Sequence, residues 1–524
     1  MNYKFLIAST ICSISSVCSD VMAVTTRQLG EIKTDVDARG NTNISAEDSL
    51  SRQFKASLEA QGIVTSDNHV PFWMRANQFG SVPLDGPSTA WIGRISRDYT
   101  SNPEKKFFDW GTAVEGRFNL GNRTDLLLIE AYAKARLGIF ELRAGRSKDM
   151  MGLADSTLST GAFAVSGNAL GIPKLQIAIP EFYRIPIWEG LLAFKGNFVY
   201  GWFGTTPINH SDPFNYIESV KEVKSYFHQK SLYGRLGKPE WRLNVIAGFN
   251  HQVMYGNERK FLRDFNLDKF ESFYHAVTGK TWVGSQNFKT KLGNQLGSID
   301  LGITYDWNNA HLFVYRQQFY DVGALARLAN VRDGLTGISL KNKIASRSGW
   351  EKIVLELFYS KNQAGELWSP VTKSGDEQYY NNFMYASGWS YKGVGIGNPF
   401  VTPRHEGRSN LRYRQDEYFV NNRVIAFHGG MEGHINKYNI KTKLSYSMNY
   451  GTYGSSPIGT SLGKDRFVID PPYFEKVNQF SGYLEVSRSF AKDWQCGIAG
   501  AFDSGQLLYN SFGLLINVKK SLRF

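Results

Sequence analysis

Polar and apolar side chains alternate in segments of roughly ten to fourteen residues that recur from about Phe54 to Phe524. In residues 129–137 the two faces carry Ile129, Ala131, Ala133, Ala135 and Leu137 against Glu130, Tyr132, Lys134 and Arg136. Alternation of this kind predicts β-strands with one face toward an apolar medium and one toward water. Strands of soluble sandwiches usually have only about five or six residues. The length of these segments therefore favours strands that cross a membrane.

The same parity recurs along the chain. In residues 110–119 one face carries Trp110, Thr112, Val114, Gly116 and Phe118, and the other carries Glu115, Arg117 and Asn119. In residues 443–450 one face carries Leu444, Tyr446, Met448 and Tyr450, and the other carries Lys443, Ser445, Ser447 and Asn449. A charge on the lipid face of a barrel strand costs about 2–4 kcal/mol at the middle of a bilayer. Charges confined to one parity are thus typical of strands with one lipid-facing side.

A closed barrel is the expected fold class. After residue 23 the sequence has no run of about 18 apolar residues, the length that a transmembrane helix needs. Hydrocarbon cannot satisfy unpaired backbone groups, so a chain that crosses it with strands must close its sheet. We predict an all-β protein, a transmembrane antiparallel β-barrel of about 18 strands with long extracellular loops.

Three regions are expected. Residues 1–23 read as a secretory signal peptide, with Lys4, an apolar run over 5–14 and the small-residue cleavage site Val21-Met22-Ala23. A lipoprotein anchor at Cys18 is the alternative, but Ser15-Ser16-Val17 makes a poor lipobox. Residues 24–53 are polar and read as a periplasmic lead-in, and residues 54–524 as the barrel. The predicted location is the outer membrane of a Gram-negative cell.

Topology follows from the last segment. Residues 511–524 form an amphipathic strand that ends on Phe524, which looks like the signal read by the outer-membrane barrel-assembly machinery and makes that machinery a partner. If this strand ends in the periplasm, connections alternate between long outside and short inside. Segments 64–88, 148–172, 379–422 and 451–478 then lie outside. The turns at Leu137-Gly138-Ile139, 434–438 and 490–493 lie inside.

The charge balance favours anionic partners. The formal net charge is +13, which suits outer-membrane lipid, the phosphates of lipopolysaccharide or an acidic polysaccharide. Lysines and arginines spread over the turns next to the membrane are an equally good explanation. Nucleic acid is excluded as a partner, because an exported chain without a basic helix or a binding motif offers no site for it.

Catalysis is not expected. Cys496 is the one cysteine left after residue 23, and the nine histidines show no metal-ligand spacing, so we predict no metal site and no cofactor. We expect no nucleophile elbow of an α/β-hydrolase and assign no catalytic residue. A lipid hydrolase with a Ser–His pair assembled between strands remains the enzymatic alternative.

A set of short motifs resembles the capsule assembly Wzi family, in the form common in Bacteroidetes. The motifs, spread over most of residues 54–524, are Pro71-Phe72-Trp73, Arg75-Ala76-Asn77-Gln78-Phe79-Gly80, Val165-Ser166-Gly167-Asn168, Ile172-Pro173, Ala193-Phe194-Lys195-Gly196, Tyr200-Gly201-Trp202-Phe203, Tyr380-Asn381-Asn382, Ser387-Gly388-Trp389, Asn421-Asn422-Arg423-Val424 and Asn449-Tyr450-Gly451-Thr452-Tyr453. The resemblance implies an 18-stranded outer-membrane barrel that binds capsular polysaccharide and helps to hold it at the cell surface.

Two segments combine the groups that bind sugars, namely aromatic faces with amides and charged groups that pair with hydroxyls or carboxylates. The candidate polysaccharide-binding residues are Phe72, Trp73, Arg75, Asn77, Gln78, Tyr379, Tyr380, Asn381, Asn382, Trp389 and Tyr391. The alternative is that these segments fold into the lumen as a plug, where the aromatic rings only pack.

Two functions fit these observations. The first is a non-enzymatic barrel that binds capsular or other surface polysaccharide and helps to assemble or retain it. The alternative is a porin-like channel for small solutes or saccharides, because a large barrel with charged lumen residues also suits a pore. The lumen-facing charges expected to form ion pairs are Glu115, Arg117, Glu130, Lys134, Arg136 and Arg143.

Overall fold

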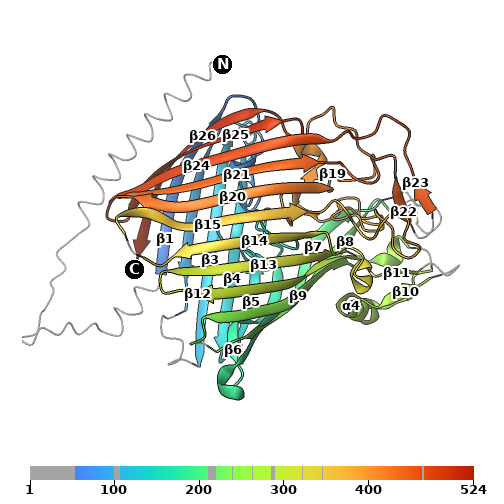
Figure 1. The fold of residues 1–524 in the computed structure, drawn as a ribbon, viewed down its shortest axis with the longest axis horizontal. Helices are drawn as coiled ribbons and strands as arrows, with labels where there is room; N and C mark the ends of the chain where they lie inside the picture. The colour runs from blue at the N-terminus through green and yellow to red at the C-terminus, as the bar shows by residue number, and fades with distance from the viewer. Residues whose placement is uncertain are drawn as a thin grey trace, which may run out of the picture. The chain divides into compact units, whose positions relative to one another are not determined.

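An antiparallel barrel of 18 strands dominates the computed structural model, which describes residues 54–99, 107–209, 220–238, 240–262, 264–284, 289–321, 323–344, 346–462 and 465–524 (Figure 1). The barrel strands are β1 (Phe54–Thr65), β2 (Ser88–Arg97), β3 (Phe108–Gly121), β4 (Asp125–Leu137), β5 (Phe140–Arg146), β6 (Lys174–Arg184), β7 (Leu192–Pro207), β8 (Glu222–Leu236), β9 (Leu243–Tyr255), β12 (Asn294–Asp306), β13 (Ala310–Tyr320), β14 (Gly334–Asn342), β15 (Ser348–Tyr359), β20 (Val424–Ile435), β21 (Tyr438–Asn449), β24 (Val477–Ala491), β25 (Trp494–Gly505) and β26 (Ser511–Arg523).

The sheet closes on itself. Every barrel strand pairs with its neighbours in chain order, and β26 returns to pair with β1. Phe54 and Phe524 exchange two backbone hydrogen bonds of 3.0 Å at this junction. The predicted fold class and strand number are confirmed. The signal peptide and the periplasmic lead-in lie outside the described residues and stay predictions.

Side chains that face the lumen alternate along β3 with side chains on the outer wall, as predicted. In β3, Trp110, Val114 and Phe118 are exposed on the outer wall, whereas Glu115 and Arg117 are buried on the inner face. None of the described helices combines the length and the apolar character needed to cross a membrane. In β3, alternate residues thus carry the hydrophobic outer surface.

One parity assignment is wrong. Ile129 was expected to share the outer face of β4, but its side chain is only 3% exposed and lies inside. The pairing of β3 with β4 shifts register here, because Glu115 faces Glu130 whereas Gly116 faces Leu128. A bulge places one extra residue in a strand and reverses the parity on its far side. Leu126 and Leu128 accordingly take the outer face.

Short turns and long loops lie at opposite ends of the barrel (Figure 1). Two-residue turns join β4 to β5, β20 to β21 and β24 to β25, and they contain Gly138, Asn436 and Asp493 with positive φ. These are the turns predicted to lie inside. The long connections, residues 66–87, 147–173, 256–293, 360–423 and 450–476, occupy the other end, as the topology predicted.

The connections carry small elements of their own. These are α3 (Phe72–Arg75), η2 (Trp188–Gly190), η3 (Glu258–Lys260), α4 (Lys269–Thr278), β10 (Thr281–Val283), β11 (Lys289–Lys291), η5 (Ala324–Arg327), β16 (Ser390–Tyr391), β17 (Val394–Gly395), β18 (Thr402–Pro403), η6 (Arg404–Glu406), β19 (Phe419–Asn421), β22 (Thr460–Leu462) and β23 (Asp465–Phe467). Apart from η2, all belong to the loop end.

Candidate functional site

Loop 66–87 enters the barrel and anchors there through the short helix α3. The backbone N–H of Phe72 donates to Asp503 over 2.8 Å, and the indole Nε1 of Trp73 donates to Ser445 over 3.1 Å. Phe72 stacks on Phe400 with ring centroids 5.4 Å apart, and Trp73 meets the same ring edge-on. Both predicted residues are buried, so they join loop 66–87 to the barrel wall and to loop 360–423.

The other members of the first predicted segment are divided between inside and outside. Arg75 forms an ion pair with Glu406. Asn77 donates its backbone N–H to Asn168 over 3.0 Å and its side-chain amide to the Thr160 carbonyl over 2.9 Å. Gln78 alone has an exposed side chain. Most of this segment therefore contacts protein.

The tyrosines of the second predicted segment are fully buried. The Tyr379 hydroxyl donates to Asp333 over 2.7 Å. The Tyr380 hydroxyl donates to the Phe163 carbonyl and accepts the backbone N–H of Asn398 over 2.7 Å. Burying a hydroxyl without a partner costs free energy, and both tyrosines avoid that cost. Tyr380 thus ties loop 360–423 to loop 147–173, and Tyr379 ties it to the connection that precedes β14.

The rest of the second segment has the same character. Asn381 exchanges two hydrogen bonds of 2.9 Å with the backbone of Phe419. Asn382 accepts the backbone N–H groups of the next turn, Trp389 is fully buried, and Tyr391 accepts a hydrogen bond of 3.2 Å from Arg146. These residues shape the interior of the plug.

Loop 147–173 brings the two predicted segments together. Its Thr160 carbonyl accepts the amide of Asn77, and its Phe163 ring lies 5.1 Å from that of Tyr380. The loop is fixed to the barrel by Glu356 of β15, which accepts hydrogen bonds of 2.6 Å from the Ser159 hydroxyl and from the Thr160 backbone. The lumen at this level is filled by loop residues.

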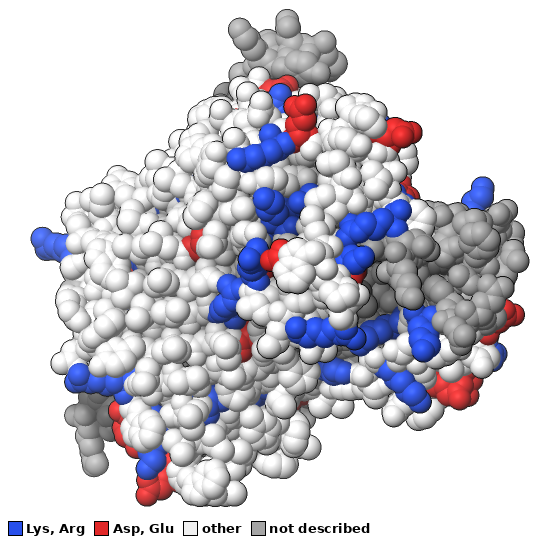
Figure 2. Space-filling view, turned by 45° about the vertical axis from the view of Figure 1, so that its right-hand side comes forward, with Lys and Arg blue, Asp and Glu red and all other residues white. Residues whose placement is uncertain are grey.

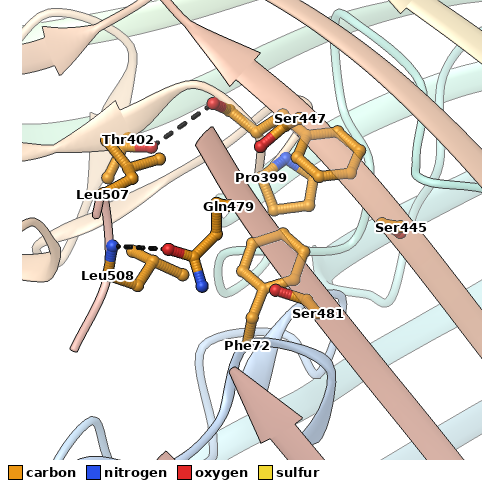
Figure 3. Close-up of a pocket in the computed structure, with 10 residues that line it drawn as sticks. Phe72, Pro399, Thr402, Ser445, Ser447, Gln479, Ser481, Leu507 and Leu508 are labelled. Carbon is orange, nitrogen blue, oxygen red and sulfur yellow. Dashed lines mark hydrogen bonds between the residues drawn. The ribbon is translucent and has the colours of Figure 1, made fainter. Parts of the chain in front are cut away.

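The space left among these residues is small. A cavity of about 10 Å³ lies where side chains from α3, β18, β21 and β24 converge (Figure 3). A space of this size holds about one water molecule. Gln479 accepts the backbone N–H of Leu508 over 3.0 Å at its margin. The cavity is too small for a sugar residue.

Ion pairs line the inner wall, as predicted, with two exceptions. Glu115 pairs with Arg94 at 3.2 Å and with Lys148 at 2.7 Å. The other pairs are Glu130 with Arg94, Lys134 with Asp98, and Arg143 with Glu141 and Asp149. Arg117 instead donates to Gln61 and Asn119, and Arg136 lies over the Tyr99 ring.

An exposed group of residues that the sequence reasoning did not single out lies at the loop end. Arg404 lies over the ring of Tyr413, 4.3 Å from its centroid, and Arg408 lies 5.8 Å from that of Tyr509. All four are partly exposed, and we call them the arginine–tyrosine patch. The basic and aromatic run 404–414, within the predicted outer segment 379–422, was the signal that could have found it.

Positive charge gathers around this end. Figure 2 shows Lys and Arg side chains clustered over the part formed by the long loops, whereas the barrel wall beside it is almost free of charge. A carboxyl beneath the surface does not offset this charge fully, because burial raises the pKa of Glu417 to about 7. The loop end therefore presents a basic surface with aromatic rings.

The described residues include side chains of the kinds that ligate metals. Among them, no group of three or more His, Cys, Asp or Glu side chains could hold a metal ion. The buried histidines have other partners: His428, for example, lies 2.7 Å from both the Ser445 hydroxyl and the Leu158 carbonyl.

Comparisons with known proteins agree with this architecture. The sequence model of the family described as capsule assembly protein Wzi matches residues 34–413. No curated protein matches by sequence. A solved structure of Wzi from Escherichia coli, an outer-membrane protein involved in group 1 capsule assembly and a carbohydrate-binding β-barrel, shares 11% identity at a TM-score of 0.52. The match covers 91% of this chain and 86% of that chain.

Two outer-membrane proteins of Pseudomonas aeruginosa are similar to a lesser degree. OpdK shares 11% identity at a TM-score of 0.42, over 90% of this chain and 99% of that chain. OprD shares 9% identity at a TM-score of 0.41, over 90% of this chain and 94% of that chain.

Proposed function

We propose, from the premise that this chain belongs to the capsule assembly protein Wzi family, that it binds capsular or other surface polysaccharide in the outer membrane and helps to retain it there. The observation that carries this proposal is the basic and aromatic loop end above a filled lumen. Aromatic faces stack on sugar rings, and guanidinium groups form paired hydrogen bonds with carboxylates and hydroxyls.

The arginine–tyrosine patch supplies both kinds of group. Its two Arg–Tyr stacks belong to loop 360–423 and to the neighbouring connection 506–510, so they present rings and guanidinium groups at the same end of the barrel. Arg408 is fixed by hydrogen bonds of 2.8 Å to the Leu508 carbonyl and 2.7 Å to the Gly505 carbonyl. A side chain that is already ordered loses less entropy on binding. We assign the first contacts with the polysaccharide to this patch.

The residues predicted from the sequence take a supporting part in this proposal. Phe72, Trp73, Tyr379, Tyr380 and Trp389 contact the polysaccharide only if the plug rearranges, because their side chains are buried. Packed as they are, they hold loops 66–87, 147–173 and 360–423 in the conformation that presents the surface. Gln78 is the predicted member whose exposed side chain can reach a glycan directly.

Binding without catalysis or transport is the simplest function for this arrangement. A porin-like channel needs an open lumen, whereas loops 66–87, 147–173 and 360–423 enter this barrel and bond to its inner wall and to one another. During biogenesis we expect the amphipathic strand β26 to engage the barrel-assembly machinery.

The experiment is a retention assay. A strain that lacks this protein is compared with its complemented parent for the ratio of cell-bound to medium-released capsular polysaccharide. We expect unchanged synthesis with a larger released fraction, and complementation by a patch variant, Arg404→Ala with Arg408→Ala, should restore retention only in part. An unchanged ratio in the deletion strain would refute the proposed function, and conductance of the purified barrel would then be measured.

A further inference from the structure

Two cations that are at least partly exposed, Lys361 and Lys476, and the 8% exposed Arg423 gather on the outer wall of the barrel, just above its apolar band. In β15 the exposed residues Leu355 and Leu357 face outward, and continuing this parity brings Tyr359 and then Lys361 to the same side. On the neighbouring strands Phe427 and Tyr446 face outward as well. The cations therefore stand where the hydrocarbon-facing surface ends and the loops begin.

The cluster is held together by tyrosine rings. The Lys361 ammonium lies 4.0 Å from the centroid of Tyr450, and the Lys476 ammonium lies 5.8 Å from the same centroid. The Arg423 guanidinium lies 3.9 Å from the centroid of Tyr453. Tyr453 in turn donates its hydroxyl to the Asn362 carbonyl over 3.2 Å. We call Lys361, Arg423 and Lys476 the outer-wall cluster.

No carboxylate among the described residues forms an ion pair with any of these three cations, although the exposed Glu475 is next to Lys476 in the chain. Burial lowers the pKa of Lys361, and the charges of Arg423 and Lys476 lower it further. Like charges brought together repel one another unless an anion lies between them. In the lumen, by contrast, carboxylates neutralise the cations, as in the ion pair of Lys352 with Asp155 at 3.2 Å.

We propose that the outer-wall cluster binds a phosphate group on the head of a glycolipid in the outer leaflet of the membrane. Its depth favours this occupant, because lipid head groups lie directly above the hydrocarbon that covers Leu355, Leu357 and Phe427. The ammonium groups of Lys361 and Lys476 can donate charge-assisted hydrogen bonds to a phosphate, and the buried Arg423 adds positive charge next to them. Tyrosines at this level are typical of the interfacial belt of a barrel.

This proposal does not depend on polysaccharide binding at the loop end. The arginine–tyrosine patch belongs to residues 404–413 and 509, whereas the outer-wall cluster lies one or two residues beyond the ends of β15, β20 and β24. A polysaccharide anion could also pair with cations of this kind. The experiment therefore measures lipid and polysaccharide separately on the same variants.

The test uses the full-length barrel in neutral detergent, with bisphosphorylated lipid A as the probe and its dephosphorylated form as the comparison, followed by native mass spectrometry. The variant is Lys361→Gln with Arg423→Gln and Lys476→Gln. A matched control removes three exposed cations of the loop end that lie elsewhere, Lys260→Gln, Lys289→Gln and Lys392→Gln. Each basic residue near a charged membrane surface contributes about 1 kcal/mol, so we expect the variant to bind the phosphorylated lipid about a hundredfold more weakly.

The control should bind this lipid like the parent, and the parent should bind the dephosphorylated lipid as weakly as the variant does. Equal binding of the phosphorylated lipid by variant and parent would overturn the proposal. So would loss of soluble polysaccharide binding with intact lipid binding, which would assign the cluster to the polysaccharide. If the triple variant does not give a heat-modifiable barrel, Lys361→Gln with Lys476→Gln leaves the Arg423–Tyr453 contact in place and is measured instead.

Discussion

Thr160 donates its backbone N–H to a carboxylate oxygen of Glu356 over 2.6 Å, and this bond ties loop 147–173 to the inner face of β15. The other carboxylate oxygen accepts the hydroxyls of Ser159 at 2.6 Å and Tyr315 at 2.5 Å. A single side chain of the wall thus satisfies three donors. The filled lumen depends on it.

Replacing that carboxylate should open the barrel. Glu356→Ala leaves the three donors without an acceptor, and each buried unsatisfied group costs about 1–3 kcal/mol. We expect loop 147–173 to detach and the conductance of single barrels in planar bilayers to rise. Glu351→Ala, at the exposed end of the same strand, should leave the conductance at the level of the parent. Equal conductance in both variants would mean that other contacts keep the plug in place.

Truncating Trp389 should destabilise the plug from within. The ring is fully buried and lies 6.4 Å from the rings of Phe203 and Phe227. Removing a buried tryptophan costs roughly 3–5 kcal/mol. Trp389→Ala should therefore speed amide hydrogen exchange in loop 360–423 while the heat-modifiable barrel persists. Exchange at the parent's rate would show that the ring contributes little to the packing of this loop.

Truncating the partly exposed tyrosines of the arginine–tyrosine patch should weaken polysaccharide binding without destabilising the plug. Tyr413→Ala and Tyr509→Ala change partly exposed positions, where substitutions usually alter stability by no more than about 0.5 kcal/mol. Loss of a stacking ring should weaken polysaccharide binding by on the order of 1 kcal/mol, about fivefold in affinity. Calorimetric titration with purified capsular polysaccharide measures this change. Tyr274→Ala, on the exposed side of α4, is the control that should bind like the parent.

The packing of loop 360–423 should weaken as the pH rises. Burial raises the pKa of Glu417 to about 7, and the carboxyl group accepts the Thr452 hydroxyl over 2.6 Å. Since the folded pKa lies above the ordinary value, protonated Glu417 stabilises the packed loop. This stabilisation is fully present below about pH 4 and is lost as the pH rises through about 7. Hydrogen exchange, corrected for its intrinsic pH dependence, should show more frequent opening at pH 8 than at pH 5. In Glu417→Gln this dependence should flatten, and an unaltered profile would assign it to another group.

A charge on the outer wall should impair insertion. Leu355 is 60% exposed in the middle of β15, on the face that hydrocarbon covers. Leu355→Arg should cost about 2–4 kcal/mol, measured by reversible urea unfolding of the barrel in lipid vesicles, whereas Leu355→Phe should remain close to the parent. A negligible cost for arginine would place this position near the head groups.

The barrel could be predicted because its determinants are local. Parity within each strand and turn residues such as Gly138 can be identified within a few positions of the chain, and both were confirmed. The bulge at Ile129 could not be predicted, because it arises from pairing between β3 and β4. Its apolar side chain fits either face, so the sequence alone gives no reason to reverse the parity.

The candidate site depends on contacts between distant segments. An aromatic residue in a loop can stack on a sugar or pack inside, and the choice for Tyr380 depends on Phe163, which lies in another loop. The same limit applies to Arg404 and Tyr413, whose stacking follows from the turn between them. Residue type alone is compatible with sugar binding by both groups, whereas their exposure is a property of the folded loops. Polysaccharide binding by the eleven predicted residues stays a prediction.

Closure of the sheet also bears on how the chain reaches this structure. Asn517 of β26 donates to Glu59 of β1 over 2.9 Å, although the two residues are 458 positions apart. Contacts of such long range form slowly, because a large loop must close before they contribute any free energy. Until β26 arrives, β1 has an unpaired edge, and an open edge can pair with another copy of the chain. An open edge of β1 thus exposes the chain to aggregation before the sheet closes, and a partner that shields this edge would reduce that risk.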